Sequence, residues 1–70
     1  MRNYEQEFTD TCKLMRNYME QNRPQSFASV WNLFQRQKTD CEYNHIQFLD
    51  ISDIEQYAKD EHIEQYGFEK

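Results

Sequence analysis

Four side chains in this sequence are of types that can bind a metal or act as a nucleophile: Cys12, Cys41, His45 and His62. Cys41 and His45 are four residues apart, a spacing that would place two zinc ligands on one helical face. There is no Cys-x-x-Cys pair, however, and Cys12 falls on an apolar stripe, where a free cysteine ordinarily serves as a small buried side chain. We therefore expect no metal site and no cofactor.

Catalysis finds little support in the same residues. A cysteine nucleophile needs a positioned histidine and an oxyanion site, and a chain with one glycine has no loop that gathers backbone N–H groups around a phosphate. Carboxylate pairs could form among Asp50, Asp53, Asp60 and Glu61, but 70 residues leave little room for the enclosed pocket that would shift their pKa values. We expect a protein without enzymatic activity.

The carboxylates themselves are the strongest chemical signal, because they concentrate in one part of the chain. Residues 41–70 carry eight carboxylates and two cations, a balance of −6, whereas residues 1–40 carry six cations and five carboxylates. The cations of the first forty residues are interspersed with acids, so they form no cluster that would displace counterions from phosphates. Direct nucleic-acid binding is not expected.

The acidic third predicts a surface that binds a partner protein. Its carboxylates would occupy the phosphate sites of a basic, nucleic-acid-binding protein, as in an inhibitor that mimics DNA, and its tyrosines would anchor the contact. The residues predicted to form this surface are Asp50, Asp53, Glu55, Tyr57, Asp60, Glu61, Glu64 and Tyr66. The alternative is a small structural or assembly subunit whose acidic surface only keeps it in solution.

Amphipathic patterns predict the elements that position these residues. Tyr4, Phe8, Cys12, Met15 and Met19 recur at spacings of three and four, which predicts a helix up to Arg23-Pro24. Pro24 would begin a second helix that fades at residues 38–40. The two helices would form an antiparallel hairpin, packed through seven side chains: Phe8, Met15, Met19, Phe27, Val30, Trp31 and Phe34.

The second half of the chain has a less regular pattern. Residues 41–51 predict a short extended or irregular segment. Ser52 with Glu55 then forms a capping box for a third, C-terminal helix that would run to about Tyr66 and end at Gly67. On such a helix Ile63 and Tyr66 would lie about half a turn from Ile54 and Tyr57, and would remain outside the core.

The fold class expected is thus mostly helical, in a single domain of residues 1–70. Eight Leu, Ile and Val residues make a thin core, which self-association into a homodimer would help to stabilise. Nothing resembles a signal peptide, and no apolar run approaches the ~20 residues that cross a bilayer. We expect a cytoplasmic protein that does not associate with membranes.

Overall fold

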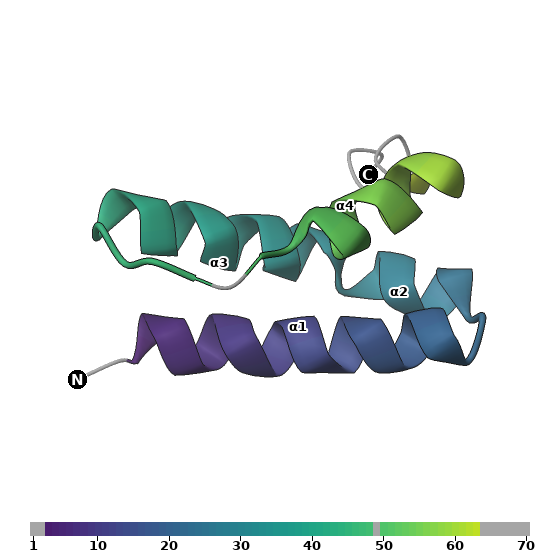
Figure 1. The fold of residues 1–70 in the computed structure, drawn as a ribbon, viewed down its shortest axis with the longest axis horizontal. Coiled ribbons are helices and arrows are strands. Elements are labelled where there is room, and N and C mark those ends of the chain that lie inside the picture. Colours follow the sequence, from purple (N-terminus) through teal and green to yellow (C-terminus); the bar gives the residue numbers. More distant parts are fainter. Residues whose placement is uncertain (1–2, 49, 64–70) are drawn as a thin grey trace.

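The computed structural model describes residues 3–48 and 50–63, which form four helices and no strand (Figure 1). The helices are α1 (Tyr4–Glu20), α2 (Pro24–Ser29), α3 (Trp31–Tyr43) and α4 (Ser52–Asp60). The predicted mostly helical class is confirmed. The radius of gyration of 11.8 Å is close to the ~11 Å of a folded chain of this length, so the arrangement is compact.

Side chains and backbone geometry define both ends of α1. Its first turn is capped by Asn3, whose side-chain oxygen accepts a hydrogen bond from the Gln6 backbone N–H at 3.0 Å. At the other end Asn22 adopts φ 55°, and the Arg23 N–H donates to the Tyr18 carbonyl at 2.9 Å. This bond across five residues is the Schellman pattern, in which a left-handed residue closes the helix.

The second predicted helix is divided into two by Val30. Val30 has φ −107° and ψ 7°, and serves as the C-cap of α2 and the N-cap of α3. Pro24 does begin α2, as expected from its missing N–H. α3 then continues to Tyr43, past the predicted end at 38–40, because Cys41 lies on its buried stripe. The irregular segment predicted for 41–51 therefore begins at Asn44. It starts with a turn over residues 44–45, in which His45 adopts φ 58°.

The third predicted helix is shorter than expected. α4 ends at Asp60, and His62 adopts φ 59°, so the chain turns there. The turn returns Ile63 to the core, where it is 1 % exposed. The expectation that Ile63 stays outside the core is wrong, because it assumed a helix continuing through residue 63. Tyr66 and Gly67 lie outside the described residues.

The helices pack in two layers around an aromatic core. α2 and α3 run back along α1, and the segment after α3 leads to α4, which contacts both α1 and α3 (Figure 1). Phe34 stacks between Phe8 and Trp31, with ring centroids 5.3 and 5.2 Å away, and Trp31 stacks on Phe27 at 6.1 Å. Of the seven predicted hairpin contacts, five are fully buried, whereas Met19 and Val30 are partly buried against the core. No described helix is long and apolar enough to cross a bilayer.

Candidate functional site

Asp53, one of the carboxylates predicted to bind a partner, is paired with a cation of its own chain. The Arg16 guanidinium of α1 donates from Nε to one Asp53 oxygen at 2.9 Å and from Nη2 to the other at 3.0 Å. Nη2 also donates to the Asp50 carbonyl at 2.8 Å. The guanidinium holds the pKa of the Asp53 carboxyl below its usual value. Asp53 therefore fastens the start of α4 to α1.

Glu55 makes the equivalent contact with α3. The Lys38 ammonium donates to Glu55 Oε2 at 2.7 Å, and both side chains are partly buried. Two ion pairs near the start of α4, Arg16–Asp53 and Lys38–Glu55, thus connect it to two different helices. Each pair contributes up to about 1 kcal/mol, because both remain in contact with water.

Asp50 is exposed but has a local structural role. Its Oδ1 accepts hydrogen bonds from the Ser52 backbone N–H at 3.0 Å and the Ser52 hydroxyl at 2.8 Å, which lowers the pKa of the Asp50 carboxyl. The predicted capping box is therefore wrong in detail: Ser52 is the first helical residue, and its side chain donates to Asp50 without capping α4 itself. The N-cap position is held by Ile51, and, of the backbone N–H groups of α4, Asp50 accepts only from that of the first helical residue.

Asp60 and Glu61 are the predicted site residues that the described structure leaves most open. Both are exposed at the end of α4, and the Gln56 amide donates to Asp60 at 3.0 Å. Neither forms an ion pair with any described cation. Glu64 and Tyr66 lie outside the described residues.

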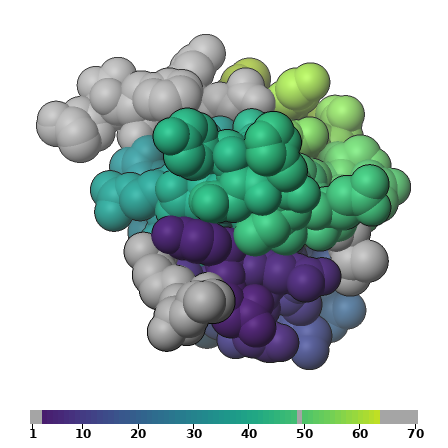
Figure 2. All heavy atoms as spheres, turned by 90° about the vertical axis from the view of Figure 1, so that its left-hand side faces the viewer, coloured from purple at the N-terminus to yellow at the C-terminus, as the bar shows by residue number. Residues whose placement is uncertain are grey.

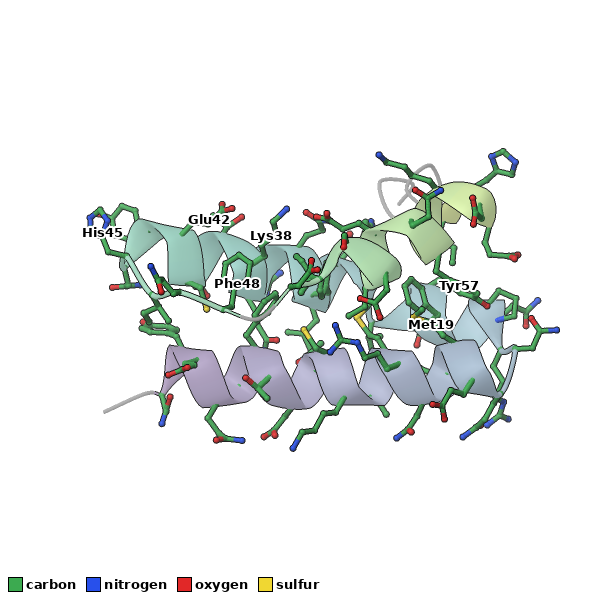
Figure 3. All side chains as sticks on the ribbon, viewed as in Figure 1. Met19, Lys38, Glu42, His45, Phe48 and Tyr57 are labelled. Carbon is green, nitrogen blue, oxygen red and sulfur yellow. The ribbon has the colours of Figure 1, made fainter. Side chains whose placement is uncertain are left out.

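Tyr57 belongs to the core more than to the surface. Figure 3 shows its side chain directed from α4 into the bundle, and its ring lies 4.8 Å from that of Phe27. The hydroxyl is buried and has no hydrogen-bond partner among the described residues, and burial raises the pKa of this phenol, with a further contribution from Glu61. Tyr57 therefore holds α4 in place and offers little surface to a partner.

A second group of carboxylates, which the sequence did not predict, meets at the end where α1 begins and α3 ends. Figure 2 looks onto this end, with the start of α1 in purple beside the end of α3 in green. Burial raises the pKa of the Cys41 thiol there, and four neighbouring carboxylates raise it further: Asp40, Glu5, Glu42 and Glu7. Two acids come from each helix, so only the antiparallel pairing of the helices could have indicated the group in advance.

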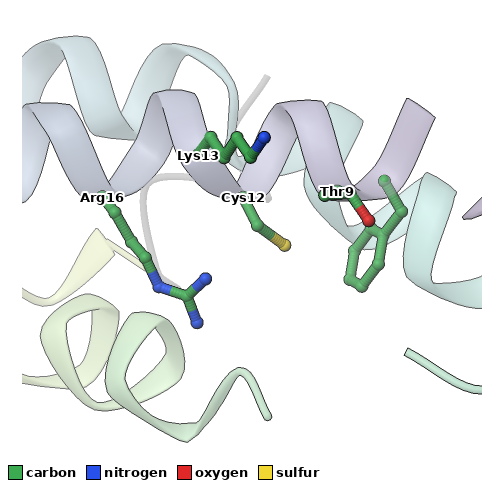
Figure 4. Close-up of a pocket in the computed structure, with 5 residues that line it drawn as sticks. Thr9, Cys12, Lys13 and Arg16 are labelled. Atoms are coloured by element: carbon green, nitrogen blue, oxygen red, sulfur yellow. The ribbon is translucent and has the colours of Figure 1, made fainter. Parts of the chain in front are cut away.

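The cysteines occupy sites suited to packing. Cys12 borders a pocket of about 70 Å³ with Phe8, Thr9, Lys13 and Arg16, and points to the same side of α1 as Arg16 (Figure 4). Burial raises the pKa of the Cys12 thiol, which keeps it protonated and a weak nucleophile. Within residues 3–48 and 50–63, no three His, Cys, Asp or Glu side chains are grouped closely enough to hold a metal ion.

No family model, curated protein or solved structure matches this chain.

Proposed function

We propose that the protein is a non-enzymatic binding protein whose acidic C-terminal third covers the basic, nucleic-acid-binding surface of a partner protein. The observation that supports this most directly is that the carboxylates at the start of α4 are paired within the chain, whereas those at its end are exposed. Asp53 and Glu55 fasten the helix to α1 and α3, while Asp60 and Glu61 are exposed at its end and form no ion pair with a cation of the described residues. A helix held in this way presents its carboxylates with little conformational entropy left to lose on binding.

In this proposal the site residues have two roles. Asp60 and Glu61, continued in sequence by Glu64 and Tyr66, contact the partner, and Asp50 adds charge at the start of α4. Asp53, Glu55 and Tyr57 position the helix. The carboxylates substitute for phosphates, so binding is strengthened mainly through charge and weakens as salt screens it.

The test uses charge reversal with a matched control. The variant Asp60→Lys/Glu61→Lys removes the proposed contact. The control, Asp10→Lys/Glu20→Lys, makes the same charge change on α1: Asp10 is exposed and accepts from Gln6 just as Asp60 accepts from Gln56, and Glu20 is exposed near the end of its helix. Each protein is immobilised and incubated with an extract of its native host at ~50 mM salt.

The parent chain and the control are expected to retain nucleic-acid-binding proteins that a 20-base-pair DNA duplex or ~200 mM salt releases. The Asp60→Lys/Glu61→Lys variant should retain at least tenfold less of the same proteins. Equal retention by both double variants would contradict charge mimicry, and would leave the acidic residues as solubilising surface on an assembly subunit.

A further inference from the structure

Two leucines are exposed on the side of the molecule away from α4. Leu14 of α1 is 40 % exposed and Leu33 of α3 is 44 % exposed, whereas most other large apolar side chains of these helices lie in the core. Tyr18 and Val30 are partly buried beside the core. We call these four residues the α1–α3 face.

A hydrogen bond between α1 and α3 shows that the two leucines lie at the same level along the helix pair. The Thr11 hydroxyl donates a hydrogen bond to the Gln37 side chain. Thr11 and Gln37 therefore lie at the same height along the axis of the helix pair. Leu14 lies three residues after Thr11, and Leu33 lies four residues before Gln37. Because the helices run in opposite directions, both leucines are one turn away from that contact in the same direction.

The described residues that follow α3 pack on the opposite side of this helix pair. Phe48 packs on Phe8 at 4.9 Å, and Arg16 and Lys38 bind α4. At 100° per residue, Arg16 is about 160° from Leu14 around α1, and Lys38 is about 140° from Leu33 around α3. In the part of the chain that the structure describes, Leu14 and Leu33 therefore remain exposed, with no element packed over them.

We propose that a second copy of this chain covers the α1–α3 face, forming a two-fold symmetric dimer. At 1.5 Å per residue, α1 and α3 are roughly 25 and 20 Å long, and two adjacent helices span roughly 20 Å. Each copy thus offers a projected area of roughly 400–500 Å², and two copies approach the ~1,000 Å² at which specific interfaces begin. The area fits a small dimer that dissociates on dilution.

Charge selects the orientation of the two copies. Glu5, Glu7, Asp40 and Glu42 gather at one end of the helix pair. With the two-fold axis perpendicular to the helices, these acidic ends lie at opposite ends of the dimer. The end of α3 then faces the start of the other copy's α3, which carries partial positive charge and has no acidic residue in its first turn. A parallel arrangement would bring the acidic ends together.

The experiment is sedimentation equilibrium of the full chain between 10 and 200 μM. The parent should approach twice its 8.7 kDa mass as concentration rises. Leu14→Glu/Leu33→Glu should remain monomeric with unchanged helical circular dichroism, because both positions are exposed in the protomer. The control Thr39→Glu/Gln47→Glu adds the same charge at exposed positions off the face, and should dimerise like the parent.

A parent chain that is monomeric at 200 μM would overturn the proposal, as would a Leu14→Glu/Leu33→Glu variant that still dimerises. The dimer is independent of the acidic site at the end of α4. Asp60→Lys/Glu61→Lys should therefore dimerise normally even if it no longer binds a partner, and loss of the dimer in that variant would also count against the face assigned.

Discussion

The two thiols connect stability to pH. Burial raises the pKa of Cys12 and of Cys41, so each thiol loses its proton at lower pH in the unfolded chain than in the folded one. The stabilisation is complete below the unfolded pKa of ~8.5 and declines as pH rises above it, by up to ~1.4 kcal/mol per pH unit for each thiol. We expect the free energy of unfolding, measured in urea, to fall between pH 8 and pH 10.

The Cys12→Ala/Cys41→Ala variant provides the control for this prediction. Its stability at pH 7 is lower because two buried sulfurs are removed, but its decline towards pH 10 should be shallower, and each single variant should lie between. A decline as steep as that of the parent would show that other groups cause the alkaline loss. The buried Tyr57 phenol, whose pKa is also raised, affects stability above pH 10.

At this same scale, the types of the candidate site residues were predictable, but their contacts were not. The sequence identifies the acidic third by counting charges. It cannot show that Asp53 meets Arg16, 37 positions earlier, or that Lys38 meets Glu55. Such pairs form only when separate helices dock, so a residue that looks available for a partner can be occupied within its own chain.

The elements depend on local capping, which a pair of asparagines on α1 can test. Asn3→Ala removes the side-chain oxygen that accepts from the Gln6 N–H, and should cost about 1 kcal/mol of stability in urea unfolding. Asn17→Ala changes an exposed residue inside the same helix to the best helix former, and should be neutral or slightly stabilising. Equal effects of the two substitutions would mean that the Asn3 cap does not stabilise α1.

The positions of the helices could be predicted from apolar spacing, and most of their ends could not. Only the third helix was predicted to end at a glycine, Gly67, and the left-handed residues that follow α1, α3 and α4 are Asn22, His45 and His62. Histidine adopts that conformation more often than most residues, but still only in a small minority of cases, so it is a weak signal in a sequence. The break between α2 and α3 at Val30 could not be predicted either, because a β-branched apolar residue is not a typical cap or terminator of a helix.

Across the whole molecule, stability depends on one column of aromatic rings. Phe34 is fully buried between Phe8 and Trp31, so Phe34→Ala should cost roughly 3–5 kcal/mol. A single core in a chain of this length supplies roughly 3–5 kcal/mol of stability, so the variant should be close to unfolded at 25 °C. Tyr43→Ala, at an 83 % exposed tyrosine, should change stability by less than ~0.5 kcal/mol. Circular dichroism during urea titration would measure both, and a folded, stable Phe34→Ala chain would contradict the assigned core.

The order of the elements along the chain also matters while the protein is being made. α1, α2 and α3 can pair as soon as residue 43 is available, since helices and hairpins form within microseconds. The twenty residues from Asn44 to Ile63 follow at ~5–20 residues per second, which takes roughly 1–4 s. For that time the nascent three-helix unit lacks Ile51, Ile54, Ala58 and Ile63, all of which complete the core. A chaperone acting during translation would therefore find Phe8 and Phe27 accessible, and would lose that access when Phe48 and Tyr57 pack on them.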